Sequence, residues 1–73
     1  MKIRIYDVGR NKKSTTIEVS TDDAGDIADV IYRAVLKMKA LMSSDVECSW
    51  DPADGKGCVY AGVRVVGYSE VVP

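Results

Sequence analysis

The residues of this 73-residue chain that could do chemistry are its carboxylates and its two cysteines. The chain contains no histidine, so Ser-His, Cys-His and His-metal arrangements cannot form within it. Two thiols alone also fall short of the ligand set of a structural zinc site. A carboxylate that acts as a general acid needs a desolvated pocket, and we expect a small sheet covered by one helix to offer little concavity. We therefore predict that the protein is not an enzyme and uses no metal ion and no cofactor.

The segment 51–57 holds two short patterns that occur in ligand sites. Gly55-Lys56-Gly57 has part of the pattern of a phosphate loop, but the full spacing and the following helix are missing. Asp51 and Asp54 suggest a calcium loop, but Ala53 stands where an oxygen ligand is needed. A proline early in the segment and Asp-Gly late in it are typical of a hairpin turn, which is the interpretation that we favour.

Basic residues gather in the first polar turn of the chain, at Arg10, Lys12 and Lys13. This cluster could contact phosphates or an acidic protein, or it could be a solvated hairpin tip. The sequence places no aromatic residue at the tip, which weakens base stacking there. The net charge of −1 also does not favour non-specific binding of nucleic acid.

Acidic residues gather at the start of the predicted helix, at Asp22, Asp26 and Asp29. They could form a patch that competes with nucleic acid for a basic groove on a partner. The helix dipole also favours anions at this end, and that explains most of these residues without a partner.

The stretch from Thr21 to about Met42 has the apolar periodicity of an amphipathic helix, so we predict a helix at about 22–42. We expect Ser20 or Thr21 to cap its start. Its apolar stripe must be buried against a sheet. The stripe consists of Ala24, Ile27, Val30, Ile31, Ala34, Val35, Met38, Leu41 and Met42.

Alternating apolar and polar residues predict strands at about 2–8, 14–20, 45–51 and 57–67. The turn between the last two strands allows two registers. A two-residue loop at Asp54-Gly55 places Cys48 opposite Ala61, whereas a four-residue loop, 52–55, shifts the pairing by two residues. Both registers keep the same alternating positions on the inner face. These positions are Val46, Cys48, Trp50, Val59, Ala61, Val63 and Val65.

The two cysteines have two interpretations, a pair of reduced and partly packed thiols or a cross-strand disulfide. Both registers place Cys48 on the inner face and Cys58 on the outer face. This arrangement argues against the disulfide.

The predicted order of elements is ββαββ within one α+β domain, residues 1–73. One helix covers one face of a four-stranded mixed sheet. The last strand is the most apolar and belongs in the middle, which gives the strand order 2-1-4-3 with a parallel centre and antiparallel flanks. Residues 67–73 form a tail in which Val71 and Val72 either pack or extend the strand.

This order brings a resemblance to β-grasp proteins. Residues 1–5 and 16–20, followed by Asp26-Ile27 at the helix, resemble the start of ubiquitin. The hairpin-helix-hairpin order is similar to that of the immunoglobulin-binding domains of protein G. The resemblance implies a β-grasp-like fold. It does not imply a modifier role, because the chain reads Glu70-Val71-Val72-Pro73 where ubiquitin has its terminal Gly-Gly.

Two surfaces remain after the core is assigned. Tyr32, Leu36 and Ala40 form a patch on the helix away from its stripe. If the first and last strands are neighbours, Tyr6 and Tyr60 lie together on the uncovered face of the sheet. The same face would hold Arg4, Arg64 and Glu47. Tyrosine and arginine are enriched in binding hot spots, although cross-strand packing also explains them.

We therefore expect a non-enzymatic module that binds a protein partner, or a second copy of itself, through these surfaces or a sheet edge. The most concrete hypothesis is a small phage or mobile-element protein that inhibits a host enzyme by occupying its surface. The alternative is a domain that binds nucleic acid or another anionic ligand through the basic first hairpin. No apolar run approaches membrane-spanning length and the start lacks an apolar signal core, so we expect no membrane partner and a cytoplasmic location.

Overall fold

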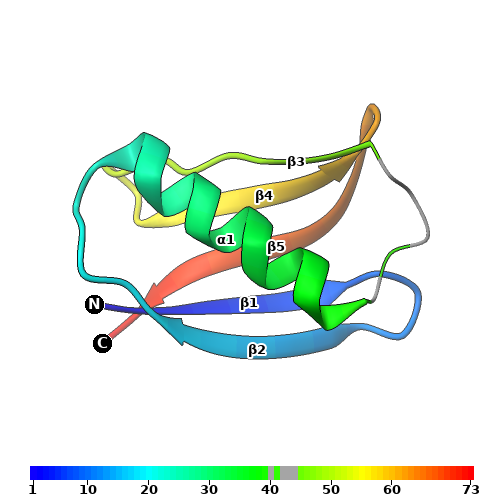
Figure 1. The fold of residues 1–73 in the computed structure, drawn as a ribbon, viewed down its shortest axis with the longest axis horizontal. Helices are drawn as coiled ribbons and strands as arrows, with labels where there is room; N and C mark the ends of the chain where they lie inside the picture. The colour runs from blue at the N-terminus through cyan, green and yellow to red at the C-terminus, as the bar shows by residue number, and fades with distance from the viewer. Residues whose placement is uncertain (40, 42–44) are drawn as a thin grey trace.

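The chain forms a curled five-stranded sheet with one helix lying across one of its faces, in a computed structural model that describes residues 1–39, 41 and 45–73 (Figure 1). The strand order is β2-β1-β5-β4-β3, and every neighbouring pair is antiparallel. The elements are β1 (Lys2–Val8), β2 (Lys13–Glu18), α1 (Ala24–Met38), β3 (Val46–Cys48), β4 (Lys56–Ala61) and β5 (Arg64–Val72).

Helix α1 is shorter than predicted because both of its ends are set by caps. Asp23 is the N-cap, and its carboxylate accepts a hydrogen bond from the Asp26 N–H at 3.1 Å. The expected caps were therefore wrong, although the Thr21 hydroxyl accepts from the Asp23 N–H at 3.2 Å and so supports the true cap. Lys39 takes a left-handed conformation, with φ 52° and ψ 33°, which ends the helix after Met38. Met42, at the predicted end, lies outside the described residues.

The first hairpin follows the predicted alternation. Ile3 and Ile5 are fully buried, and they pair with Ile17 and Thr15 of β2. A bulge with Asp7 at φ 54° then shifts the phase of the strand, so that Val8 is also buried.

The hairpin of β3 and β4 takes the second of the two predicted registers. Cys48 pairs with Val59, and an isolated bridge joins Asp51 to Lys56 across the four-residue loop 52–55. Both thiols are free.

The prediction of four strands in a mixed sheet was wrong. The single strand expected at 57–67 is two strands, β4 and β5, joined by a two-residue turn between Ala61 and Arg64. Gly62 supplies the positive φ, 63°, that a type II′ turn needs at its first central position. The chain therefore reverses, and β5 runs antiparallel to β1 with Ile3 opposite Val71.

Two consequences follow from this turn. The segment expected to be a tail is the second half of the longest strand, β5. The parallel pair expected at the sheet centre, from the placement of the apolar last strand beside the first, is replaced by an antiparallel pair.

The core lies between α1 and the inner face of the sheet. The apolar stripe of the helix packs against this face, as predicted. The fully or nearly fully buried apolar residues are Ile3, Ile5, Val8, Val19, Ile27, Ile31, Val35, Val46 and Val59. Two residues expected on the inner face are exposed, because Val63 lies in the turn and is 100% exposed and Val65 is 46% exposed. Cys48, Trp50 and Ala61, expected on the same face, are partly buried. A register shift after Val59 also changes the phase of β4 against β5. Within the described residues, no helix is long and apolar enough to cross a membrane.

Candidate functional site

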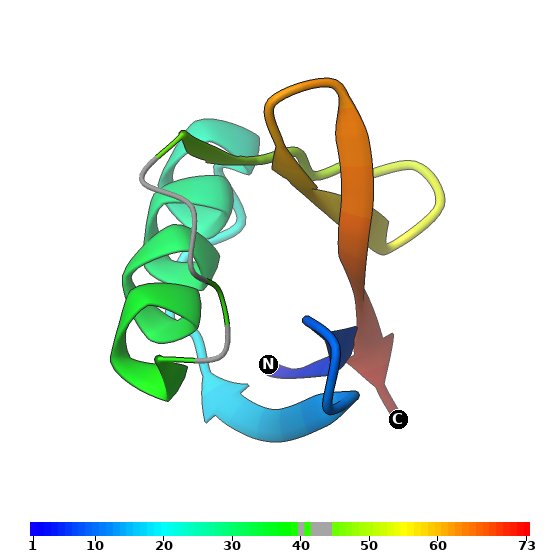
Figure 2. The same ribbon diagram turned by 90° about the vertical axis from the view of Figure 1, so that its right-hand side faces the viewer.

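The outer face of the sheet, which we call the open face, carries a cluster of side chains from the central strand β5 and its neighbour β1. In Figure 2 the helix lies to one side of the sheet, and among the described segments the 51–55 loop alone projects past β5 on the opposite side. The cluster, which we call the aromatic cluster, consists of Arg4, Tyr6, Tyr68 and Glu70.

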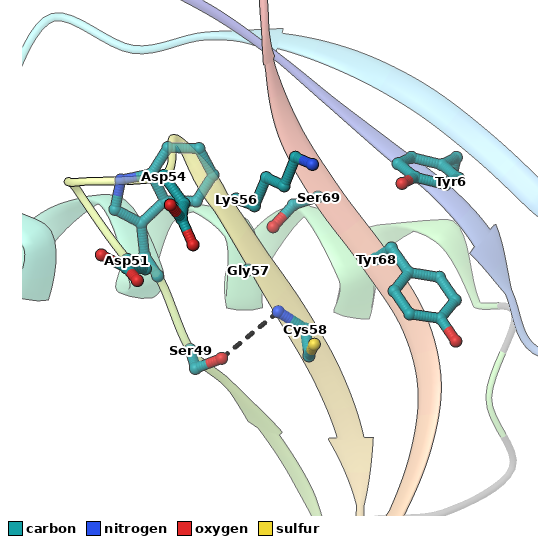
Figure 3. A pocket seen from close by; sticks show the side chains of 10 residues that line it. Tyr6, Ser49, Asp51, Asp54, Lys56, Gly57, Cys58, Tyr68 and Ser69 are labelled. Atoms are coloured by element: carbon teal, nitrogen blue, oxygen red, sulfur yellow. Dashed lines mark hydrogen bonds between the residues drawn. The ribbon is translucent and has the colours of Figure 1, made fainter.

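The contacts within the aromatic cluster run from strand to strand. The rings of Tyr6 and Tyr68 are stacked, with centroids 5.7 Å apart and an interplanar angle of 28°. The Arg4 guanidinium carbon lies 4.7 Å from the centroid of the Tyr6 ring, and Arg4 Nη1 lies 3.7 Å from Glu70 Oε1. Figure 3 shows Tyr6 and Tyr68 side by side on the open face.

The register of β1 and β5 creates this cluster. Ile3 and Ile5 point into the core, so the alternating residues Arg4 and Tyr6 point outward. Arg4 pairs with Glu70, and Tyr6 pairs with Tyr68, so each pair meets directly across the two strands.

These contacts stabilise the fold only modestly. An exposed cation–π contact contributes about 0.5–1 kcal/mol, and an aromatic pair adds about 0.5–1.5 kcal/mol. Both side chains of the Arg4–Glu70 ion pair are more than a third exposed, 51% for Arg4 and 35% for Glu70. The pair therefore adds little stability in water. Tyr68 remains 43% exposed, which leaves ring surface that only a second molecule can bury.

A depression of about 350 Å³, which we call the open-face pocket, adjoins the aromatic cluster. It is a shallow depression that is open to solvent, not a deep cavity. Tyr6 and Tyr68 form one side, and the loop after Trp50, with Asp51, Asp54 and Lys56, forms another (Figure 3). The lining combines three aromatic side chains, those of Tyr6, Trp50 and Tyr68, with the charged side chains of Asp51, Asp54 and Lys56.

Gly57 lets the pocket floor pack closely. The Ser49 N–H donates to the Cys58 carbonyl at 3.0 Å, and the Cys58 N–H donates to the Ser49 hydroxyl at 3.2 Å. This arrangement turns the Ser49 carbonyl toward Gly57, and a Cβ added at Gly57 would collide with that carbonyl. The buried Ser69 hydroxyl lies 2.9 Å from the same point and has no hydrogen-bond partner among the described residues.

The thiol that faces the core offers no nucleophile to this surface. Burial raises the pKa of the Cys48 thiol to about 11, so near neutral pH it stays protonated and unreactive. Within the described residues, no three or more Cys, Asp or Glu side chains are grouped closely enough to hold a metal ion.

Several residues predicted for the open face lie apart from the cluster. Tyr60 does not adjoin Tyr6, because β5 lies between β4 and β1. Tyr60 pairs instead with Glu47 of the edge strand β3. Arg64 begins β5 near the tip of the first hairpin, far along the strand from Arg4.

Sequence reasoning missed two residues of the aromatic cluster, Tyr68 and Glu70. Both were assigned to a tail, and their places beside Tyr6 and Arg4 depend on the turn at Gly62 and the antiparallel register that follows. The one available signal was the Gly-Val pair inside an apolar run, since glycine at the first central position suits a two-residue hairpin turn.

The predicted helix surfaces are only partly exposed. Leu36 is 49% exposed, but Tyr32 is half-buried and packs against the core. Ala40 lies outside the described residues. Within its described part, the patch therefore exposes mainly Leu36.

The acidic residues at the helix start have local roles. Asp26 lies in the first turn, where its N–H meets the cap. Asp29 forms an ion pair with Arg33 at 2.9 Å, one turn along the helix. Asp22 is exposed beside the cap.

A comparison of the chain with protein families, curated proteins and solved structures gives no match.

Proposed function

We propose that this protein is a non-enzymatic interaction module that binds a protein partner through the aromatic cluster and the adjoining open-face pocket. The observation that supports this most is the Tyr6–Tyr68 stack with Arg4 beside it, placed on the open face away from the core. Tyrosine and arginine are the residue types most often found at binding hot spots. A partner that buries this cluster would contact side chains that contribute little to the stability of the fold.

The shape and charge of the surface indicate what kind of partner it fits. Glu70 lies beside Arg4, so the cluster carries no strong net charge and would select by shape and apolar contact. The open-face pocket of about 350 Å³ can accept one large apolar or aromatic side chain. Such an anchor in a pocket, surrounded by a polar rim, is the usual energetic centre of a protein interface.

Two more specific forms of this proposal remain predictions. One is inhibition of a host enzyme by occupying its surface. The other is self-association, in which the same face of two copies would meet about a two-fold axis.

The proposal can be tested by site-specific photo-crosslinking in cells of the native source. A photoreactive phenylalanine analogue replaces Tyr68 in one variant and Leu36 in a control variant, because both positions are similarly exposed, 43% and 49%. We expect one partner to be captured from position 68 and not from position 36. Capture of that same partner only from position 36 would contradict the proposal.

The captured partner is then purified and titrated with defined variants. Tyr6→Ala should weaken binding at least about tenfold, as a hot-spot residue does. Leu36→Ala, the matched control, should change the affinity less than about twofold. Equal losses from the two variants would show that the open face has no special role.

A further inference from the structure

Basic side chains from three separate parts of the fold line one groove of about 870 Å³. We call it the basic groove. Its cations are Arg10, Lys12, Lys13, Lys39 and Arg64. Among the described residues that line it, Asp7 is the one acidic side chain. The sequence pattern showed three of these five cations together, and the fold adds the other two.

The local backbone explains why these residues converge. The first hairpin turns tightly at its tip, where the Lys12 N–H donates to the Gly9 carbonyl at 3.2 Å. Lys39 is the left-handed cap that ends α1, and Arg64 follows the turn that starts β5. All three sites lie at the same end of the molecule, at the right of Figure 1.

The net charge of −1 conceals this concentration of positive charge. The start of α1, with Asp22, Asp23 and Asp26, lies at the opposite end of the molecule, as does the 51–55 loop (Figure 1). These three aspartates and this loop thus lie apart from the groove along the longest dimension, 29 Å, whereas Asp45 lies beside the β4–β5 turn at the basic end. A polyanion that approaches the basic end is attracted by a local positive potential, although the net charge of the protein is negative.

An aromatic residue also reaches the basic groove. Tyr68 lines it and lines the open-face pocket as well. The sequence placed no aromatic residue at the basic hairpin tip, and the antiparallel return of β5 supplies one. Proteins commonly bind single-stranded nucleic acid with this combination, in which cations contact the phosphates and an exposed aromatic ring stacks on a base.

We propose that the basic groove binds single-stranded nucleic acid, with phosphates along Arg10, Lys12, Lys13, Lys39 and Arg64 and a base stacked on Tyr68. A duplex keeps its base faces inside the stack and cannot use Tyr68 in this way. An acidic peptide without aromatic residues could pair with the cations but offers no planar ring to the tyrosine. This proposal goes beyond the protein-partner proposal, because its charged residues lie outside the aromatic cluster.

The test is fluorescence anisotropy with a labelled oligothymidylate of about ten nucleotides, measured over a range of salt concentrations. If the five cations each contact a phosphate, the logarithm of the binding constant should fall with the logarithm of salt with a slope near −3.5, about −0.7 for each contact on a single strand. A duplex of the same length and an acidic peptide of similar charge serve as competing probes.

Variants separate the groove from the rest of the surface. Arg10→Glu with Arg64→Glu should weaken binding at least about tenfold and reduce the magnitude of the slope by about 1.4. Lys2→Glu with Arg33→Glu makes the same change in charge outside the groove and should change the affinity less than about threefold. Arg10→Gln with Arg64→Gln repeats the test if charge reversal disturbs folding, and circular dichroism checks the fold of each variant.

Three outcomes would overturn the proposal. The first is no binding of the oligothymidylate below about 1 mM at low salt. The second is an equal loss in the two double variants. The third is an acidic peptide that binds as tightly as the oligonucleotide, together with no effect of Tyr68→Leu on oligonucleotide binding. Because Arg10 and Arg64 lie outside the aromatic cluster, each of these outcomes leaves the protein-partner proposal standing.

Discussion

At the scale of single residues, the molecule depends on positions where one atom decides the packing. Gly57 is the clearest case, because its missing side chain leaves room for the Ser49 carbonyl beneath the open-face pocket. Backbone atoms cannot move aside as a flexible side chain can. A methyl group at this position must therefore displace either β4 itself or the backbone at Ser49.

Gly57→Ala should lower the free energy of unfolding by more than about 2 kcal/mol. Urea denaturation followed by circular dichroism measures this change. Gly25→Ala is the matched control, since the added Cβ meets only the Asp23 carboxylate, at 3.2 Å, and alanine suits a helix. The control should change the stability by less than about 1 kcal/mol. A Gly57→Ala variant as stable as the control would contradict the described packing of the pocket floor.

Cys48 provides a pH-dependent prediction. Its pKa is raised from 9.0 to about 11 by burial, so the unfolded chain loses this proton at a lower pH than the folded chain. The contribution of the thiol to stability is therefore fully present below pH 9.0 and is lost as the pH rises to about 11. The difference in unfolding free energy between wild type and Cys48→Ser should shrink over that range.

The same burial should slow alkylation. With Cys58→Ser, one thiol remains. Iodoacetamide at about pH 8 should then react with the folded protein about 100-fold more slowly than with the protein in urea, because the raised pKa lowers the thiolate population by about that factor. Equal rates in the two states would mean that Cys48 is not buried.

At the scale of elements, the helix and the hairpins next to it are those that the sequence predicts best. Each of these elements has a repeat that only one type of secondary structure satisfies. The helical repeat is seen at Ile27, Ile31 and Val35, and the alternation of a strand at Ile3 and Ile5. The register of β3 and β4 was narrowed to two possibilities by the turn residues, and the four-residue loop is the one observed.

The turn at Gly62 could not be predicted with the same rules. The segment from Cys58 to Val66 is almost continuously apolar, and a buried central strand has the same pattern. A type II′ turn needs little more than glycine at its first position, so no cluster of polar residues marks it. The aromatic cluster and the basic groove both depend on this turn, and neither could therefore be assembled from the sequence.

The helix start gives a prediction at this scale. Asp23→Ala should lower the free energy of unfolding by about 1 kcal/mol, because it removes the side-chain acceptor of the Asp26 N–H. Ser20→Ala, at the position first expected to cap the helix, should change it by less than about 0.5 kcal/mol. Thermal denaturation of the two variants compares them directly. A larger effect at Ser20 would place the cap three residues earlier than the structure does.

At the scale of the whole molecule, two surfaces meet at Tyr68. The aromatic cluster lies on the open face, and the basic groove lies at one end of the long axis. A protein partner and a nucleic-acid strand would both contact this tyrosine. In both proposals the sheet and the helix hold these groups in place at the surface, since the fold buries few of them.

The most direct test of the open face is chemical-shift mapping by NMR, with the captured partner added to isotope-labelled protein. We expect the largest amide shifts at Lys2–Tyr6 of β1 and Tyr68–Val72 of β5, the segments that pair to form the aromatic cluster. Shifts that concentrate instead around Tyr32 and Leu36 of the helix, with β1 and β5 unchanged, would contradict the proposal that the open face is the contact surface.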